Sequence, residues 1–168
     1  MTVIDEDKHE ILYFAYGSNM STEQMRRRCA YSTPVGLGHL PGWKWIINER
    51  GYANVVPDGS QNAPGVYGLL YLLPPRDEDA LDVYETVPIA YEKAKLEVTW
   101  LRDSTGKAFD PCQTLQALVY VNHAQVAESN PNEEYIERME AAINDAVANW
   151  GMAREYADLA LRRFWAES

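Results

Sequence analysis

One glutamate in this chain has the setting of an acid–base catalyst. Glu85 lies among small and apolar neighbours, which are Val83, Tyr84, Thr86, Val87, Pro88, Ile89 and Ala90. Burial in such surroundings disfavours the charged carboxylate and raises its pKa. A carboxyl group with a pKa near neutrality can both accept and donate protons at physiological pH. The alternative is a solvated glutamate at a helix end, since the chain holds 25 acidic residues.

A turn of small residues follows the first apolar run of the chain. The run 11–16 is aromatic and strand-like, and Gly17-Ser18-Asn19 comes directly after it. Ser21 is a good helix N-cap, and a glutamine three residues later completes a capping box. A turn between a strand and a helix start leaves backbone N–H groups that can hold an anion or an oxyanion. The alternative is an ordinary turn that binds nothing.

The elements that position these residues follow from the apolar pattern. Apolar or alternating runs predict strands at 11–16, 43–48, 51–56, 66–73, 91–100 and 115–121. Capping signals and helical periodicity predict helices at 21–28, 76–84, 131–150 and 152–165. Segment 31–41 is glycine-rich and loop-like, although Val35 and Leu37 could make a short strand. This order predicts an α+β fold, a small mixed or antiparallel barrel-like sheet flanked by helices, two of them C-terminal.

Length and charge limit the class of protein. A chain of 168 residues predicts a single domain, 1–168, and its polar start predicts a loose tail over 1–9. The net charge of −10 argues against a nucleic-acid or anionic membrane surface. The basic run 26–28 ends the first predicted helix and is interpreted as a solvated helix end. Because no apolar run reaches ~20 residues and the start is acidic, we expect no membrane span, no signal peptide and a cytoplasmic location.

Cysteine and histidine patterns predict neither a disulfide framework nor a metal site. Cys29 and Cys112 are interpreted as free thiols, and His9, His39 and His123 lack the spacing of metal ligands. Cys29 follows three arginines, which could lower its pKa and make a reactive thiol. We expect His39 and His123 to be structural or exposed rather than catalytic.

The turn at Gly17 is part of a longer match. The stretch Phe14-Ala15-Tyr16-Gly17-Ser18-Asn19-Met20 resembles the FAYGSN signature of the gamma-glutamylcyclotransferase family. Further segments resemble the family in the same order, at 51–57, 66–71, 81–85 with Tyr91, 131–135 and 151–156. The resemblance covers roughly 11–160 and implies the fold of that family. The family usually has Glu-Gly where this chain has Glu85-Thr86, so we expect the local loop to differ in shape.

The resemblance also implies a reaction and a set of site residues. Such enzymes are lyases or acyltransferases of glutathione metabolism, which release 5-oxoproline when the α-amine of a gamma-glutamyl amide attacks its γ-carbonyl. Glu85 is implied to be the catalytic acid and base. The implied substrate-binding residues are Tyr16, Gly17, Ser18, Asn19, Tyr91 and Tyr135; for the tyrosines the alternative is plain core packing. An intramolecular attack needs positioning rather than a covalent intermediate, so we expect no cofactor and no metal.

Several functions stay open at this point. The favoured one is an enzyme acting on a small-molecule gamma-glutamyl substrate: a dipeptide, glutathione, a gamma-glutamylamine or a biosynthetic adduct. Formation of a homodimer is a further possibility that the sequence leaves open. The second interpretation is a ligand-binding or interaction protein that kept the fold without the reaction. The third is a hydrolase that uses Ser18, although the chain has neither a G-x-S-x-G elbow nor an obvious histidine partner for it.

Overall fold

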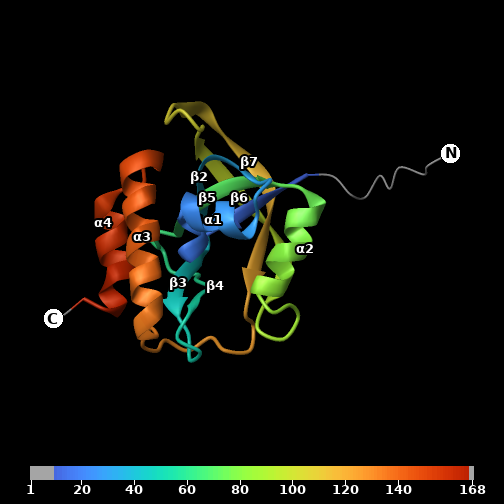
Figure 1. Cartoon of the computed structure of the whole chain (residues 1–168). Coiled ribbons are helices and arrows are strands. Elements are labelled where there is room, and N and C mark those ends of the chain that lie inside the picture. The colour runs from blue at the N-terminus through green and yellow to red at the C-terminus, as the bar shows by residue number, and fades with distance from the viewer. Residues whose placement is uncertain (1–9, 167–168) are drawn as a thin grey trace.

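The computed structural model describes residues 10–166, and a closed barrel of five strands forms its centre (Figure 1). The strands follow one another around the barrel in the order β1 (Ile11–Ala15), β5 (Val66–Leu73), β2 (Thr33–Leu40), β6 (Glu92–Arg102) and β7 (Ala108–Val121). Neighbours are antiparallel except for β1 and β7, which run parallel where Tyr13 pairs with Leu118. The predicted α+β class and mixed, barrel-like sheet are confirmed. The expected loose tail, 1–9, lies outside the described residues.

Strand β5 shows why the barrel forms from this sequence. It pairs with β1 on one side and with β2 on the other, so it is a central strand. A strand that is buried on both faces needs an apolar run rather than an alternating one. Leu69, Leu70 and Tyr71 are almost fully buried, and they share one core cluster with Phe14 of β1 and Val98 of β6.

Strand β2 corrects the prediction of a loop over 31–41. Its glycines stand where neighbouring backbones pass too close for a side chain. A Cβ on Gly36, where φ is +138°, would collide with the carbonyl oxygen of Arg102 in β6, and a Cβ on Gly38 would lie 3.0 Å from Leu70. A β-bulge also falls just before Gly36. Glycine therefore marks close strand packing and a bulge in this segment, whereas the sequence pattern alone is typical of a loop.

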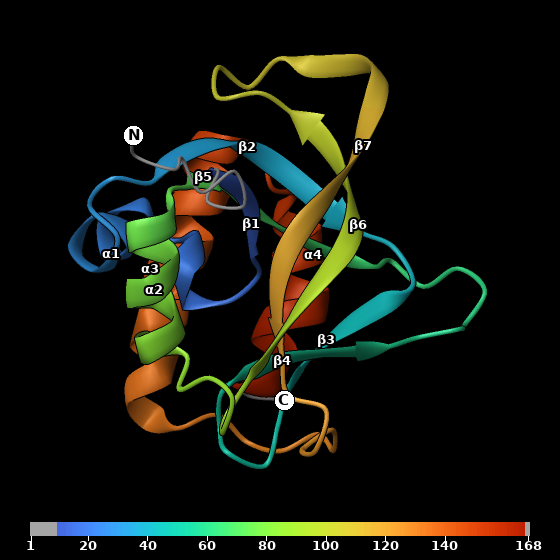
Figure 2. The same ribbon diagram turned by 90° about the vertical axis from the view of Figure 1, so that its right-hand side faces the viewer.

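Helices α1, α2 and α3 lie side by side along one flank of the barrel, at the left of Figure 2. Helix α1 (Thr22–Arg28) begins after Ser21. The Ser21 Oγ accepts a hydrogen bond from the backbone N–H of Gln24 at 3.2 Å, as the capping signal predicts. Helix α2 (Pro75–Tyr84) follows β5 and buries Leu81. Helix α3 (Glu133–Trp150) ends at Gly151, which adopts the left-handed conformation with φ of +82°.

In Figure 1 the β3–β4 hairpin lies below the barrel, and the C-terminal segment runs alongside α3. Strands β3 (Trp43–Ile47) and β4 (Ala53–Pro57) form a separate antiparallel hairpin. The C-terminal segment predicted as one helix over 152–165 starts two residues later and changes type along its length. It consists of α4 (Arg154–Tyr156), a π-helical turn (Ala157–Leu161) and a 3-10 turn (Arg162–Phe164). Within 10–166, no helix has the length and apolarity needed to cross a membrane.

Candidate active site

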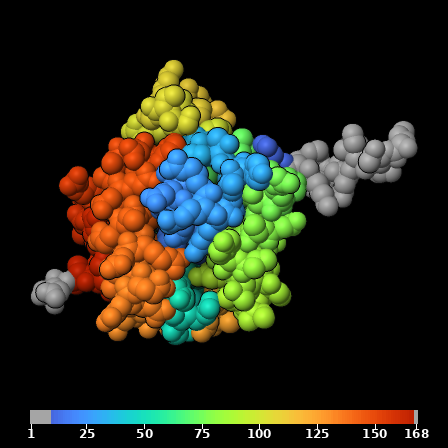
Figure 3. Space-filling model, in the orientation of Figure 1, coloured from blue at the N-terminus to red at the C-terminus, as the bar shows by residue number. Residues whose placement is uncertain are grey.

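A cavity of about 270 Å³ opens where the ends of several elements meet. It lies between the turn after β1, the end of α1, the end of α2, the β3–β4 loop and the start of α3. Figure 3 shows the hollow where the blue, green, orange and teal segments come together. The structure brings all seven predicted site residues to this cavity: Tyr16, Gly17, Ser18, Asn19, Glu85, Tyr91 and Tyr135.

Glu85 caps the C-terminus of helix α2. Its backbone N–H donates to the carbonyl of Leu81 at 2.8 Å, and its side chain is partly exposed toward the cavity. The residue after it, Thr86, adopts a φ of +51°, in the left-handed region that favours glycine. This geometry explains why a glycine suits the position after the glutamate. Here a β-branched residue adopts this conformation and lines the cavity itself.

The surroundings of Glu85 set its acidity. Among residues 10–166, Glu85 has the only acidic side chain that lines the cavity. Its carboxyl group forms no hydrogen bond or ion pair with any of these residues. Burial raises its pKa from 4.5 to about 7, although the guanidinium groups of Arg28, Arg138 and Arg50 act in the opposite direction. At neutral pH the carboxyl group is therefore present in both protonation states, as an acid–base catalyst requires.

The turn after β1 is a single 3-10 turn, Ser18–Met20. Its first backbone bond runs from the Met20 N–H to the Gly17 carbonyl at 3.0 Å, so the N–H groups of Ser18 and Asn19 have no acceptor within the turn. Gly17 has no room for a side chain, because a Cβ there would lie 2.8 Å from the hydroxyl of Tyr135. The Tyr135 hydroxyl lies near the Ser18 N–H, so a ligand at the turn would bind the Asn19 N–H and take the place of Tyr135 at the Ser18 N–H.

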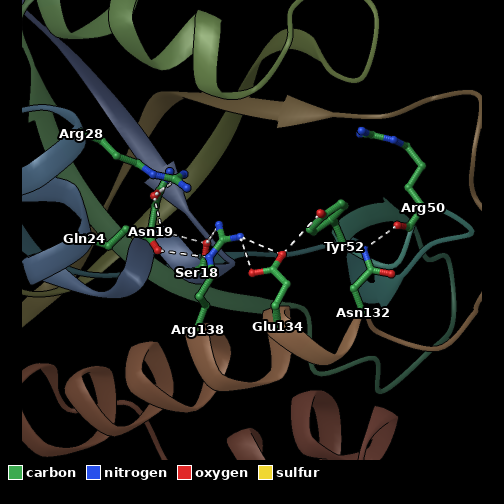
Figure 4. Close-up of polar contacts among 9 residues, drawn as sticks. All are labelled: Ser18, Asn19, Gln24, Arg28, Arg50, Tyr52, Asn132, Glu134 and Arg138. Atoms are coloured by element: carbon green, nitrogen blue, oxygen red, sulfur yellow. Dashed lines mark hydrogen bonds and ion pairs between the residues drawn. The ribbon is translucent and has the colours of Figure 1, made fainter.

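The side chains of the turn are held by other polar groups, shown in Figure 4. The side-chain amide of Gln24 donates through Nε2 to Ser18 Oγ and to Asn19 Oδ1, each at 2.8 Å. This replaces the second bond of the expected capping box, in which Gln24 would bind the backbone of Ser21. Arg138 Nη2 also donates to Ser18 Oγ at 3.1 Å, and Arg28 Nη1 donates to Asn19 Oδ1 at 3.3 Å.

The three predicted tyrosines are both core residues and cavity walls. Tyr16 donates its hydroxyl hydrogen bond to the Tyr120 carbonyl at 2.6 Å, and Tyr91 donates to the Ala53 carbonyl at 2.7 Å. Burial raises the pKa of Tyr16 and Tyr91 well above the usual value and that of Tyr135 to about 12. These hydroxyls are therefore neutral near pH 7, and they can position a substrate but cannot act as bases.

Three arginines of the described residues line the cavity, and none was singled out from the sequence: Arg28, Arg50 and Arg138. The run 26–28 ends α1 as predicted, but Arg28 is partly buried rather than solvated, and its guanidinium lies 4.6 Å from the Tyr84 ring centre, at the cavity edge. Helical spacing could have found Arg138, which follows Tyr135 by one turn of α3. No local signal marks Arg50.

The structure also tests the other reactive groups. Ser18 Oγ is bound by an amide and a guanidinium, and neither can act as a general base for a serine nucleophile. Cys29 and Cys112 are free thiols, as expected. Burial and the nearby Asp77 raise the pKa of Cys29 to about 12, which overturns the idea of a reactive thiol beside the arginines. His39 is partly buried and bonds the Pro64 carbonyl at 2.7 Å.

Comparison with known proteins identifies the same family that the sequence motifs resemble. The family model for "Gamma-glutamyl cyclotransferase, AIG2-like" matches residues 13–140. The chain is 30% identical, over 134 residues, to gamma-glutamyl cyclotransferase gliK of Aspergillus fumigatus; the match covers 67% of this chain and 48% of that protein. The chain thus spans about half the length of this relative.

Solved structures share the fold at lower identity. A gamma-glutamyl cyclotransferase structure matches with a TM-score of 0.72 and 19% identity, covering 89% of this chain and 85% of that one. YkqA from Bacillus subtilis matches with a TM-score of 0.71 and 23% identity, covering 95% of this chain and 55% of that one. Because the family model extends over well more than half of the sequence, the chain belongs to the gamma-glutamyl cyclotransferase, AIG2-like, family.

Proposed function

We propose that this chain, as one domain, is a gamma-glutamyl cyclotransferase that converts a gamma-glutamyl amide into 5-oxoproline and a free amine. One observation carries the proposal. Burial raises the pKa of the Glu85 carboxyl group to about 7, and this group lines the cavity without a hydrogen-bond or ion-pair partner among residues 10–166. A carboxylate left in that condition is suited to exchanging protons with a bound substrate.

The proposed reaction is an intramolecular acyl transfer. Glu85 takes a proton from the α-ammonium group, and the free amine attacks the γ-carbonyl carbon to form the ring C–N bond. The carbonyl oxygen gains negative charge, which the backbone N–H groups of Ser18 and Asn19 can stabilise. Protonated Glu85 then donates to the leaving nitrogen, and the amide C–N bond breaks.

The same carboxylate can account for every proton transfer of the reaction. The α-nitrogen loses two protons, one before and one after the attack. The leaving nitrogen gains two, one at bond cleavage and one when the released amine becomes an ammonium ion. Glu85 can carry both in turn, because it is the one acid that lines the cavity within the described chain. The tyrosine hydroxyls and the turn hold the substrate in the geometry for ring closure.

The test is 5-oxoproline release, measured by mass spectrometry. The panel contains gamma-glutamyl amino acids, gamma-glutamylamines and glutathione, each offered to the native chain, to Glu85→Gln and to Glu137→Gln. Glu137 lies exposed on α3 and is a matched control. We expect release by the native chain and the control but not by Glu85→Gln, with thermal stabilisation by ligand retained in all three. Stabilisation without release in the native chain would favour a binding protein, and equal release by Glu85→Gln would refute the assigned role.

A further inference from the structure

The cavity carries more positive charge than a gamma-glutamyl group requires. In the described part of the chain, three arginines and one glutamate line it, although the whole chain has 25 acidic and 15 basic residues. The gamma-glutamyl group has one α-ammonium and one α-carboxylate, so it is neutral overall. One guanidinium is enough to pair with one carboxylate. Even with Arg138 paired to Glu134, one more guanidinium remains than the α-carboxylate needs, which points to a second anionic group on the substrate.

Two of the arginines are tied to the turn after β1. Arg138 donates to Ser18 Oγ at 3.1 Å and forms an ion pair with Glu134 at 3.4 Å. Arg28 donates to Asn19 Oδ1 at 3.3 Å. Both guanidinium groups therefore stand beside the part of the cavity that is proposed to hold the gamma-glutamyl group.

Arg50 differs from both in its position and in its bonding. It comes from the β3–β4 loop and lies beyond Tyr52 from the other two arginines (Figure 4). Its guanidinium lies 5.7 Å from the centre of the Tyr52 ring and forms no hydrogen bond or ion pair with any residue in 10–166. A partly buried guanidinium without an acceptor is well suited to bind an anion that enters the cavity.

The backbone that carries Arg50 is nevertheless fixed. The Arg50 N–H donates to Asn48 Oδ1 at 3.1 Å, and the Arg50 carbonyl accepts from Asn132 Nδ2 at 3.1 Å. The carbonyl of the next residue, Gly51, accepts from the Asn132 N–H at 3.1 Å. The loop is thus attached to the start of α3, and the charge of Arg50 acts on the cavity, where it lowers the pKa of Glu85.

We propose that Arg50 binds a carboxylate on the leaving amine, so that the site selects gamma-glutamyl amino acids or peptides over gamma-glutamylamines. This inference rests on the proposed function for the gamma-glutamyl part of the substrate. Arg50 is a specificity-determining residue in this scheme. It pairs with the carboxylate of the leaving group, while the turn after β1 and the two other arginines face the gamma-glutamyl end.

The experiment compares two ligands that differ only in the charge of interest. Gamma-glutamyl-alanine carries the carboxylate, and gamma-glutamyl-alaninamide replaces it with a neutral amide of the same shape. Calorimetry measures the binding of each to the Glu85→Gln protein, which should not turn them over, and to the same protein with Arg50→Gln or Arg76→Ala added. Arg76 is a matched control because its guanidinium also lies over a tyrosine ring, that of Tyr31, but away from the cavity.

We expect the acid to bind about tenfold to a hundredfold more tightly than the amide, as a charge-assisted hydrogen bond predicts. Arg50→Gln should remove most of that preference by weakening the acid alone, and Arg76→Ala should leave it unchanged. Equal binding of acid and amide, equal weakening of both by Arg50→Gln, or no binding of either would overturn the inference. If the acid is preferred through Arg50 but the native chain releases no 5-oxoproline from it, the proposed reaction fails while the inference stands.

Discussion

Glu85→Gln should stabilise the protein against unfolding, by an amount that grows with pH. In the folded state burial raises the pKa of Glu85 from 4.5 to about 7. The folded chain therefore binds more protons than the unfolded chain between these two pH values. Because of this, the free energy of unfolding falls as the pH rises through that window. Glutamine has the same shape and does not ionise, so it removes this dependence.

The magnitude follows from the two pKa values. The buried carboxylate costs about 1 kcal/mol of folding stability at pH 5 and about 3 kcal/mol at pH 8. The stability gap between Glu85→Gln and the native chain should therefore widen by about 2 kcal/mol over this range. Urea unfolding followed by tryptophan fluorescence at pH 5 and at pH 8 measures the gap directly.

The control for this experiment is Glu137→Gln on the exposed face of α3. A surface substitution of this kind should change stability by less than about 0.5 kcal/mol at either pH. A gap for Glu85→Gln that is the same at pH 5 and pH 8 would show that the carboxylate is not desolvated in the folded protein. A stability gap between Glu85→Gln and the native chain that narrows with rising pH would mean that folding lowers the pKa of Glu85. That result would remove the physical basis for Glu85 as an acid and base at neutral pH.

Three further predictions follow from the site. First, kcat/KM for 5-oxoproline release should fall as the pH is lowered, with a midpoint near pH 7. Arg28→Gln should move that midpoint upward, since Arg28 lowers the pKa of Glu85; an unmoved midpoint would contradict this interaction between Arg28 and Glu85. Second, Thr86→Gly should raise the free energy of unfolding in urea by about 0.5–1 kcal/mol, because it relieves the left-handed backbone but loosens the unfolded chain; a loss of stability would refute this. Third, Gly17→Ala should lower kcat/KM by about tenfold to a hundredfold, because the new methyl group displaces the Tyr135 hydroxyl. Adding Tyr135→Phe should restore the stability that Gly17→Ala loses, and no recovery in urea unfolding would show that the clash lies elsewhere.

Local signals were sufficient wherever neighbours in the sequence determine the structure. The apolar run of β5, the N-cap at Ser21 and the stop at Gly151 all lie where the pattern predicts them. The cavity also gathers Glu85 and the turn at Gly17, both of which residue type and local pattern alone single out. Their roles in catalysis stay predictions.

Segment 31–41 shows where local reasoning failed. Its glycines are typical of a loop, yet β2 is a central barrel strand because β5 and β6 pass beside it. The close approach of the Arg102 carbonyl to Gly36 is a contact between distant segments, and no local pattern contains it. The same holds for the bulge before Gly36.

The sequence by itself determined the fold class, most of the elements and the apolar setting of Glu85, because short-range periodicity and capping encode these, and its motifs carried the family resemblance. Only the tertiary structure decided which charges face the cavity. Arg28, Arg50 and Arg138 come from α1, the β3–β4 loop and α3, and only packing around the barrel brings them together. The pKa of Glu85 was decided in the same way, since it is the difference between burial by distant segments and attraction to those three arginines.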